Sequence, residues 1–202
     1  MKKNNNEMDI VFLLDRSGSM GGIVEDTIGG YNSYINKEKD NNIRVTTVLF
    51  DNQYEMITNR EDIKNIKLLD NKTYYVRGCT ALLDAIGKTI KYMDNVDNKV
   101  LFIITTDGLE NASVEYNKGQ IKEMISGHTN WEFMYIGANI DSYGEASSIG
   151  IKRDNVANYK KTEKGVKTLF NSIGKASKVM YECDCLDASW KQDLEDYIEE
   201  NK

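Results

Sequence analysis

The chain has 202 residues, a net charge of −6 and 40 % hydrophobic residues. This length and composition are typical of one globular domain and exclude a disordered chain. The negative charge argues against nucleic acid as the main partner, because phosphate binding needs a basic face. Residues 1–7 lack the apolar core of a secretory signal, and no apolar run approaches the roughly 20 residues that cross a membrane. We therefore expect a protein without membrane contact.

The cysteine and histidine content indicates where the protein is located and which metals it could bind. Three cysteines, Cys79, Cys183 and Cys185, make neither a disulfide framework nor a Cys-x-x-Cys motif, and His128 is the single histidine. A structural zinc site is therefore not expected, because these residues lack the ligand spacing of such sites. A reducing, cytoplasmic location is expected instead.

The first predicted element organises the chain. The apolar run from Ile10 to Leu14 is bounded by turn residues and predicts a strand buried on both faces, which is typical of parallel sheets covered by helices. Residues 21–38 predict a helix in which Gly29 and Gly30 would allow close packing against the sheet. Strands at 43–50 and 53–58 are joined by a short turn, so they must be antiparallel.

The remaining elements alternate in type. Residues 60–79 are expected to be irregular, and Thr80 is expected to be the N-cap of a helix reaching residue 94. Strands are predicted at 99–106, 131–138 and 156–159, and helices at 115–126, 141–149 and 162–181. This alternation predicts an α/β fold, a doubly wound, mostly parallel sheet of about six strands with one antiparallel edge strand and helices on both faces.

The predicted organisation is a disordered tail at 1–7, one domain at 8–182 and an acidic C-terminal segment at 183–202. That segment carries Leu186, Trp190, Leu194 and Ile198 at helical spacing. It is expected to dock on the domain, because an isolated short helix is marginally stable.

Polar side chains gather where two of the buried strands end. Asp15 ends the first strand, Ser17 and Ser19 follow it, and Asp107 ends the strand at 99–106. The carboxyl ends of parallel strands lie on one edge of the sheet, and Thr80, at the start of a helix, can reach the same edge. Carboxylates and hydroxyls are hard oxygen donors that suit Mg²⁺ or Mn²⁺. Alone, Asp-x-Ser-x-Ser is more typical of an ordinary turn or helix cap than of a metal site.

Over residues 8–182 the sequence resembles the von Willebrand factor type A (vWA) domains, most of all the single-domain cytoplasmic type found in bacteria and their phages. The five positions that match the family's metal-ion-dependent adhesion site are Asp15, Ser17, Ser19, Thr80 and Asp107. The resemblance implies that the three hydroxyls bind Mg²⁺, with Mn²⁺ or Ca²⁺ as other candidates, and that the two carboxylates act directly or through water. It also implies an open coordination position that an Asp or Glu carboxylate of a partner protein fills.

The leading hypothesis is thus a protein-binding module and not an enzyme. One alternative is a Mg²⁺-dependent phosphohydrolase on a similar sheet. A haloacid-dehalogenase-like site would need a second Asp where this chain has Ser17. Another alternative is a scaffolding subunit with an unused site, against which the intact five-residue set counts.

Residues beside the motif have simpler expected roles. Arg16 is expected to be a solvated arginine, although it could steer an acidic partner. Glu110 and Asn111 are expected to shape the loop after Asp107. Cys79 is expected to be a small buried side chain, and His128 to be exposed and without contacts.

Overall fold

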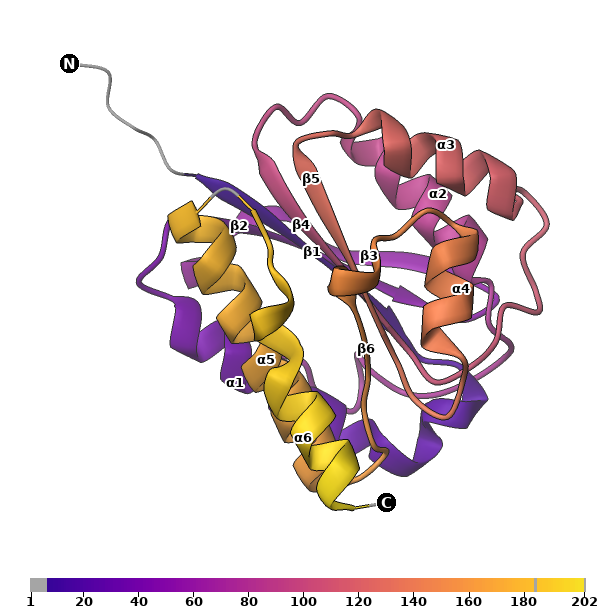
Figure 1. Ribbon diagram of the computed structural model, residues 1–202, viewed down its shortest axis with the longest axis vertical. Helices are drawn as coiled ribbons and strands as arrows, with labels where there is room; N and C mark the ends of the chain where they lie inside the picture. The colour runs from indigo at the N-terminus through magenta and orange to yellow at the C-terminus, as the bar shows by residue number, and fades with distance from the viewer. Residues whose placement is uncertain (1–6, 184, 202) are drawn as a thin grey trace.

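The computed structural model describes residues 7–183 and 185–201. A six-stranded sheet lies between two layers of helices (Figure 1). Its order is β3-β2-β1-β4-β5-β6, and every neighbouring pair is parallel except β2 and β3. The strands are β1 (Met8–Asp15), β2 (Ile43–Phe50), β3 (Tyr54–Asp62), β4 (Lys99–Thr106), β5 (Trp131–Gly137) and β6 (Val156–Asn158). The predicted fold class, including the antiparallel edge strand, is confirmed.

Figure 1 shows α1, α5 and α6 on one face of the sheet and α2, α3 and α4 on the other. The helices are α1 (Val24–Glu38), α2 (Leu82–Met93), α3 (Lys118–Gly127), α4 (Ser142–Ser148), α5 (Glu163–Cys183) and α6 (Gln192–Glu200). Short 3₁₀ turns are η1 (Gly18–Ile23), η2 (Ile63–Asn65), η3 (Arg153–Asn155) and η4 (Ala188–Lys191). In the described part of the chain, no helix has both the length and the apolar character to cross a membrane.

The central strand β1 shows why its sequence is continuously apolar from Ile10 to Leu14. Ile10, Phe12 and Leu14 face the core beneath α1 and α5, whereas Val11 and Leu13 face the core beneath α2 and α3. All five side chains are fully buried. Because side chains alternate along a strand, a sheet covered on both faces requires a continuous apolar run rather than an alternating one.

The strand order places the candidate site. From β1 the chain moves to β2 and β3 on one side, and then crosses to β4, β5 and β6 on the other side. β1 and β4 therefore flank the point where the winding direction reverses, and ligands in open α/β sheets bind in the crevice outside the carboxyl ends of such strands. Asp15 ends β1 and Asp107 follows β4.

Two predictions about α1 and α2 were wrong in detail. A Cβ on Gly30 would overlap the ring of Phe170 on α5, and Gly29 has no neighbour within 4 Å of such an atom. Gly30 thus allows close packing between helices, not against the sheet. The N-cap of α2 is Ala81, which makes no side-chain cap hydrogen bond, so Thr80 is free for another role.

Strand β3 is longer than predicted, and the C-terminal segment packs on the domain. Strand β3 runs to Asp62, so it includes residues predicted to be irregular. Hydrogen bonds to β2 extend β3 across two register irregularities, which a sequence pattern does not reveal. Residues 1–6 of the predicted disordered tail lie outside the described residues. At the other end, Trp190 and Leu194 are fully buried in the core beneath α1 and α5, and the indole N–H of Trp190 donates to the Asp154 carbonyl at 3.0 Å.

Candidate metal centre

Asp15 is a fully buried carboxylate at the end of β1. Its Oδ1 accepts a hydrogen bond from the backbone N–H of Ser17 at 2.6 Å, and its Oδ2 accepts one from Thr106 Oγ1 at 2.6 Å. Burial raises the pKa of Asp15 to about 6, although these hydrogen bonds oppose the rise, and the nearby charge of Asp107 adds to it. No ion pair among the described residues includes Asp15. This carboxylate is thus a buried acid that lacks a counter-ion of its own.

The three predicted hydroxyls and the second carboxylate lie beside it. Ser17 Oγ is 3.0 Å from Ser19 Oγ, and Ser19 Oγ donates to Asp107 Oδ1 at 2.5 Å. A Cβ on Gly108 would lie 2.7 Å from Thr80 Oγ1 and 3.5 Å from Ser19 Oγ. The Thr80 hydroxyl therefore points toward Gly108 and the Ser19 hydroxyl. Because the Thr80 hydroxyl comes so close, only glycine fits at position 108. All five predicted positions meet at the carboxyl edge of the sheet.

The chemistry of this donor set fits a hard divalent ion. It offers two carboxylates and three hydroxyls, which are ligand types that Mg²⁺, Mn²⁺ and Ca²⁺ accept. Within residues 7–183 and 185–201, no group of three or more His, Cys, Asp or Glu side chains could hold a metal. The set is therefore unlike a zinc centre and depends on its hydroxyls.

Lys161 is a member of this cluster that the sequence reasoning missed. Its ammonium lies 2.5 Å from Asp107 Oδ2 and donates a hydrogen bond to the Ser19 carbonyl at 2.6 Å. Lys161 lies between β6 and α5, three residues beyond the strand end at Asn158. The carboxyl ends of parallel strands lie on one edge of the sheet, so a residue just after β6 lies on the same edge as Asp107. The predicted topology was therefore enough to place Lys161 near the site.

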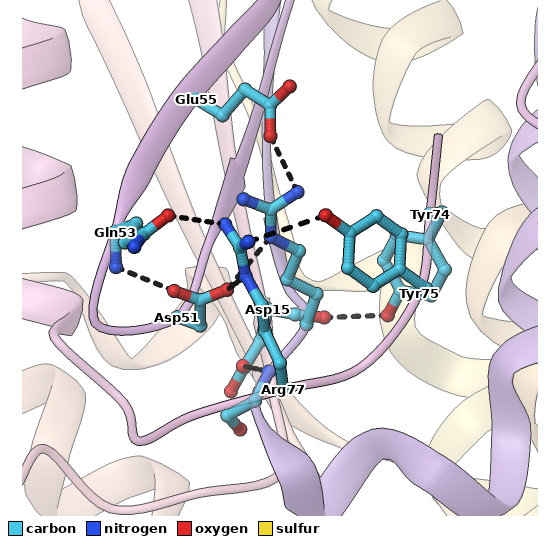
Figure 2. Close-up of polar contacts among 9 residues, drawn as sticks. Asp15, Asp51, Gln53, Glu55, Tyr74, Tyr75 and Arg77 are labelled. Carbon is cyan, nitrogen blue, oxygen red and sulfur yellow. Dashed lines mark hydrogen bonds and ion pairs between the residues drawn. The ribbon is translucent and has the colours of Figure 1, made fainter. Parts of the chain in front are cut away.

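Arg16 does not extend into solvent as predicted, because it is fully buried. Its Nε lies 3.0 Å from Asp51 Oδ2 and its Nη1 lies 2.7 Å from Glu55 Oε2. Arg77 Nε reaches the same Asp51 oxygen at 2.7 Å, as Figure 2 shows, so both guanidinium groups converge on that carboxylate. The Tyr75 ring lies beside both, with its centroid 5.6 Å from Arg16 Cζ and 5.5 Å from Arg77 Cζ. A buried arginine is stable here because its charge is paired.

This arginine network ties the loop after β1 to the loop that carries Thr80. The backbone N–H of Arg77 donates to the Arg16 carbonyl at 2.9 Å, and the N–H of Gly18 donates to the Gly78 carbonyl at 3.2 Å. Gly78 has a φ of +66°, a conformation that disfavours other residues. Beneath the loop, Tyr74 Oη donates to the Asp15 carbonyl at 2.6 Å (Figure 2). The two loops are therefore held as one unit.

Glu110 and Asn111 shape the loop after Asp107, as predicted, and Asn111 also holds Thr80 from the other side. The carboxylate of Glu110 accepts hydrogen bonds from the backbone N–H groups of Leu83, Ala112 and Ser113. The Oδ1 of Asn111 accepts from the Thr80 N–H at 2.9 Å, and the Asn111 N–H donates to the Thr80 carbonyl at 3.0 Å. Both polar groups of the Thr80 backbone are thus fixed.

Two further expectations were wrong. Cys79 is exposed, because the neighbouring Thr80 is the residue whose side chain turns inward. His128 is engaged, since it forms the C-cap of α3. Its ring nitrogens lie 2.8 Å from the Met124 carbonyl and 3.1 Å from Asp94 Oδ1, and its ring centroid lies 4.1 Å from that of Trp131.

The sequence has no match among protein-family models or curated proteins. Solved structures do match, at a low level of identity. Proximal thread matrix protein 1 from the mussel byssus is 15 % identical with a TM-score of 0.64, and the match covers 84 % of this chain but 45 % of that one. The chain thus spans about half the length of that protein.

Two smaller domains match over more of their own length. The vWF domain of the type V pilus tip protein Mfa5 from Porphyromonas gingivalis is 9 % identical, with a TM-score of 0.64 and coverage of 87 % of this chain and 96 % of that chain. The manganese-loaded TRAP protein of Plasmodium vivax is 19 % identical, with a TM-score of 0.58 and coverage of 82 % and 74 %. At such identities the likeness concerns the fold. This chain has a vWA-like α/β fold.

Proposed function

We propose that this protein is a metal-dependent protein-binding module. In this proposal Asp15, Ser17, Ser19, Thr80 and Asp107 hold a Mg²⁺ ion, and the ion binds an Asp or Glu carboxylate of a partner protein. The observation that carries the proposal is the meeting of three hydroxyls and two carboxylates at the point where the sheet reverses its winding. The pilus and manganese-loaded neighbours with the same fold support it.

The charges of the donor set suit recognition of an anion. Ser17, Ser19 and Thr80 offer neutral oxygens, so a divalent ion bound through them would keep much of its positive charge. Mg²⁺ requires about six oxygens in near-octahedral geometry, which leaves a place for an external ligand. The net charge of −6 would repel an acidic partner at long range, but physiological salt limits that effect to about 8 Å.

The surroundings of the site offer a surface for a protein. Leu109, two residues after Asp107, is 54 % exposed, and Tyr75 beside the arginine network is 41 % exposed. Exposed apolar and aromatic side chains next to a charged anchor are typical of protein interfaces. We propose a protein partner, and neither nucleic acid nor a membrane surface.

A binding role is better supported than a phosphohydrolase. Asp15 is fully buried and both of its oxygens accept hydrogen bonds, so it is badly placed to attack a phosphate. We keep a cytoplasmic location in the proposal, because Cys79, Cys183 and Cys185 are exposed free thiols, which persist in reducing compartments.

The test begins with the metal. Titration calorimetry with Mg²⁺ and Mn²⁺ should show one site in the wild type and none in Asp107→Ala. Asp97→Ala, which removes an exposed carboxylate before β4, is the matched control and should bind normally. A partner captured in Mg²⁺ should then dissociate in chelator, and one Asp or Glu→Ala change in that partner should abolish binding. A partner that binds equally in chelator and to Asp107→Ala contradicts the proposal.

A further inference from the structure

Among the described residues, the candidate metal centre contains one cation, the ammonium of Lys161. It lies 2.5 Å from Asp107 Oδ2 and 2.6 Å from the Ser19 carbonyl oxygen. The Asp107 side chain is 1 % exposed, and its Oδ2 has no hydrogen-bond donor among the described residues apart from this ionic contact. The lysine thus closes the solvent side of one of the two carboxylates that the metal would need.

The charge of Lys161 offsets part of the charge of the site. Asp15 and Asp107 bring two buried negative charges close together, and no other Lys, Arg or His in the described part of the chain pairs with either. One ammonium leaves the cluster with a net charge of about −1. A divalent ion that entered beside the ammonium would be repelled by it at short range, where solvent screening is weak.

The backbone around Lys161 is held, so the side chain can move alone. Tyr159 is 3 % exposed, and its N–H donates to the Gly137 carbonyl at 2.9 Å. On the other side, Thr162 Oγ1 accepts from the Gly165 N–H at 3.1 Å and so closes the first turn of α5. The Lys161 side chain is 22 % exposed, so its flexible stem has a route to solvent.

We propose that Lys161 is a tethered cation that neutralises the site in the metal-free protein and competes with the divalent ion for Asp107. The inference rests on the proposed metal site. It differs from a supporting role, in which Lys161 would hold Asp107 in place for the metal and remain there after binding. The two roles predict opposite effects when the charge of Lys161 is removed.

The first experiment is a Mn²⁺ titration of the purified full chain by calorimetry. Lys161→Met keeps the length of the side chain and removes the charge, so Mn²⁺ should bind about tenfold tighter, which corresponds to about 1.4 kcal/mol. Lys161→Arg keeps the charge and should stay close to the wild type. Lys160→Met is the matched control, because the neighbouring lysine contacts the Asn201 carbonyl and no carboxylate of the site. It should leave the affinity unchanged.

The second experiment observes the lysine directly in the wild type. Acetylation by a limiting amine-reactive reagent, followed by peptide mass spectrometry, gives the relative reaction rates of Lys161 and Lys160. Saturating Mn²⁺ should raise the rate of Lys161 at least about twofold, because the released amine reaches solvent, and should leave Lys160 unchanged. A mere support for Asp107 would not become more reactive.

The outcomes separate the two proposals. Weaker or equal Mn²⁺ binding by Lys161→Met, or an unchanged labelling rate of Lys161, overturns the tethered cation while the metal site stands. Absence of Mn²⁺ binding in the wild type and in Lys161→Met overturns both. Binding by Lys161→Met alone supports the tethered cation, since the lysine would then exclude the ion completely, and contradicts a metal-dependent function of the wild type.

Discussion

Two charge clusters lie side by side at the carboxyl edge of the sheet, and their charges are balanced differently. In the first, Arg16 and Arg77 face Asp51 and Glu55, so two cations meet two carboxylates. In the second, Lys161 pairs with Asp107, and Asp15 has no ion pair among the described residues. The first cluster is neutral as it stands, whereas the second keeps an unpaired negative charge.

The difference between the clusters indicates different roles. A neutral network with a buried pair at its centre, Arg16 and Asp51, contributes to the shape of the loops and has no need of a ligand. An uncompensated buried carboxylate costs free energy, and a bound cation would remove that cost. The arginine cluster therefore acts as a frame for the loops, and the aspartate cluster is the place where a ligand would stabilise the fold.

Loss of the frame should have the largest effect. Arg16→Met should lower the free energy of unfolding by about 3–5 kcal/mol. The change leaves buried Asp51 with one cation instead of two and leaves Glu55 without its arginine. Urea unfolding measures this change. Arg44→Met is the control, since its half-exposed pair with Glu7 should be worth under about 1 kcal/mol. Equal losses in the two variants would show that the buried network is not a frame.

Metal should stabilise the wild type by filling the unbalanced cluster. A ligand that binds only the folded state at a concentration of 100 times its Kd adds about 2.7 kcal/mol to the free energy of unfolding. Urea unfolding with and without Mg²⁺ should show this gain in the wild type and in Asp97→Ala, and no gain in Asp107→Ala. A similar Mg²⁺ response in Asp107→Ala would mean that the ion binds elsewhere.

Neutralising Asp15 should stabilise the metal-free protein at high pH. Burial raises the pKa of Asp15 to about 6 from the ordinary 3.8, so the folded state binds the proton more tightly than the unfolded state. The stability that this proton contributes is therefore present below about pH 4 and is lost as the pH rises through 6. Asp15→Asn should be more stable than the wild type by about 1–3 kcal/mol at pH 8 without metal.

The amide can be accommodated because the Thr106 hydroxyl has a second acceptor, the Gly108 carbonyl at 3.2 Å. Urea unfolding at pH 4 and pH 8 measures the effect, and the advantage of Asp15→Asn should disappear at pH 4. An advantage that is the same at both pH values would show that Asp15 is not a strained, ionised acid in the folded protein.

The frame and the site were predictable from the sequence to different degrees. Asp15 and Asp107 followed from two apolar runs that end in acids, because a sheet covered on both faces sets both the pattern and the edge on which strands end, whereas the complete set with Ser17, Ser19 and Thr80 came from the resemblance to vWA domains. Arg16 was misjudged, since its burial depends on Asp51 and Glu55, which lie 35 and 39 residues away in the sequence. A short pattern contains no information on such a distant ion pair.

The same limit explains Lys161 and Gly30. The ammonium of Lys161 meets Ser19 across 142 residues of sequence, and the contact of Gly30 with Phe170 joins α1 to α5. Periodicity indicates which face of a helix is buried, but it does not indicate which helix covers it. His128 was misjudged for a local reason, because a cap position can engage a polar side chain even in a hydrophilic turn.

The smallest expected effect concerns Asn111, whose Oδ1 accepts a hydrogen bond from the Thr80 backbone N–H at 2.9 Å. This bond joins the loop after Asp107 to the loop that carries Thr80. Asn111→Ala should lower the free energy of unfolding by about 0.5–1.5 kcal/mol, the usual worth of one hydrogen bond. Asn117→Ala is a matched control, because it removes a similar bond, to the Gln120 N–H at 3.1 Å, in the cap of α3. Calorimetry should show weaker Mn²⁺ binding only in Asn111→Ala, since only that change loosens the Thr80 hydroxyl. Equal Mn²⁺ affinities in the two variants would show that Thr80 takes no part in the metal site.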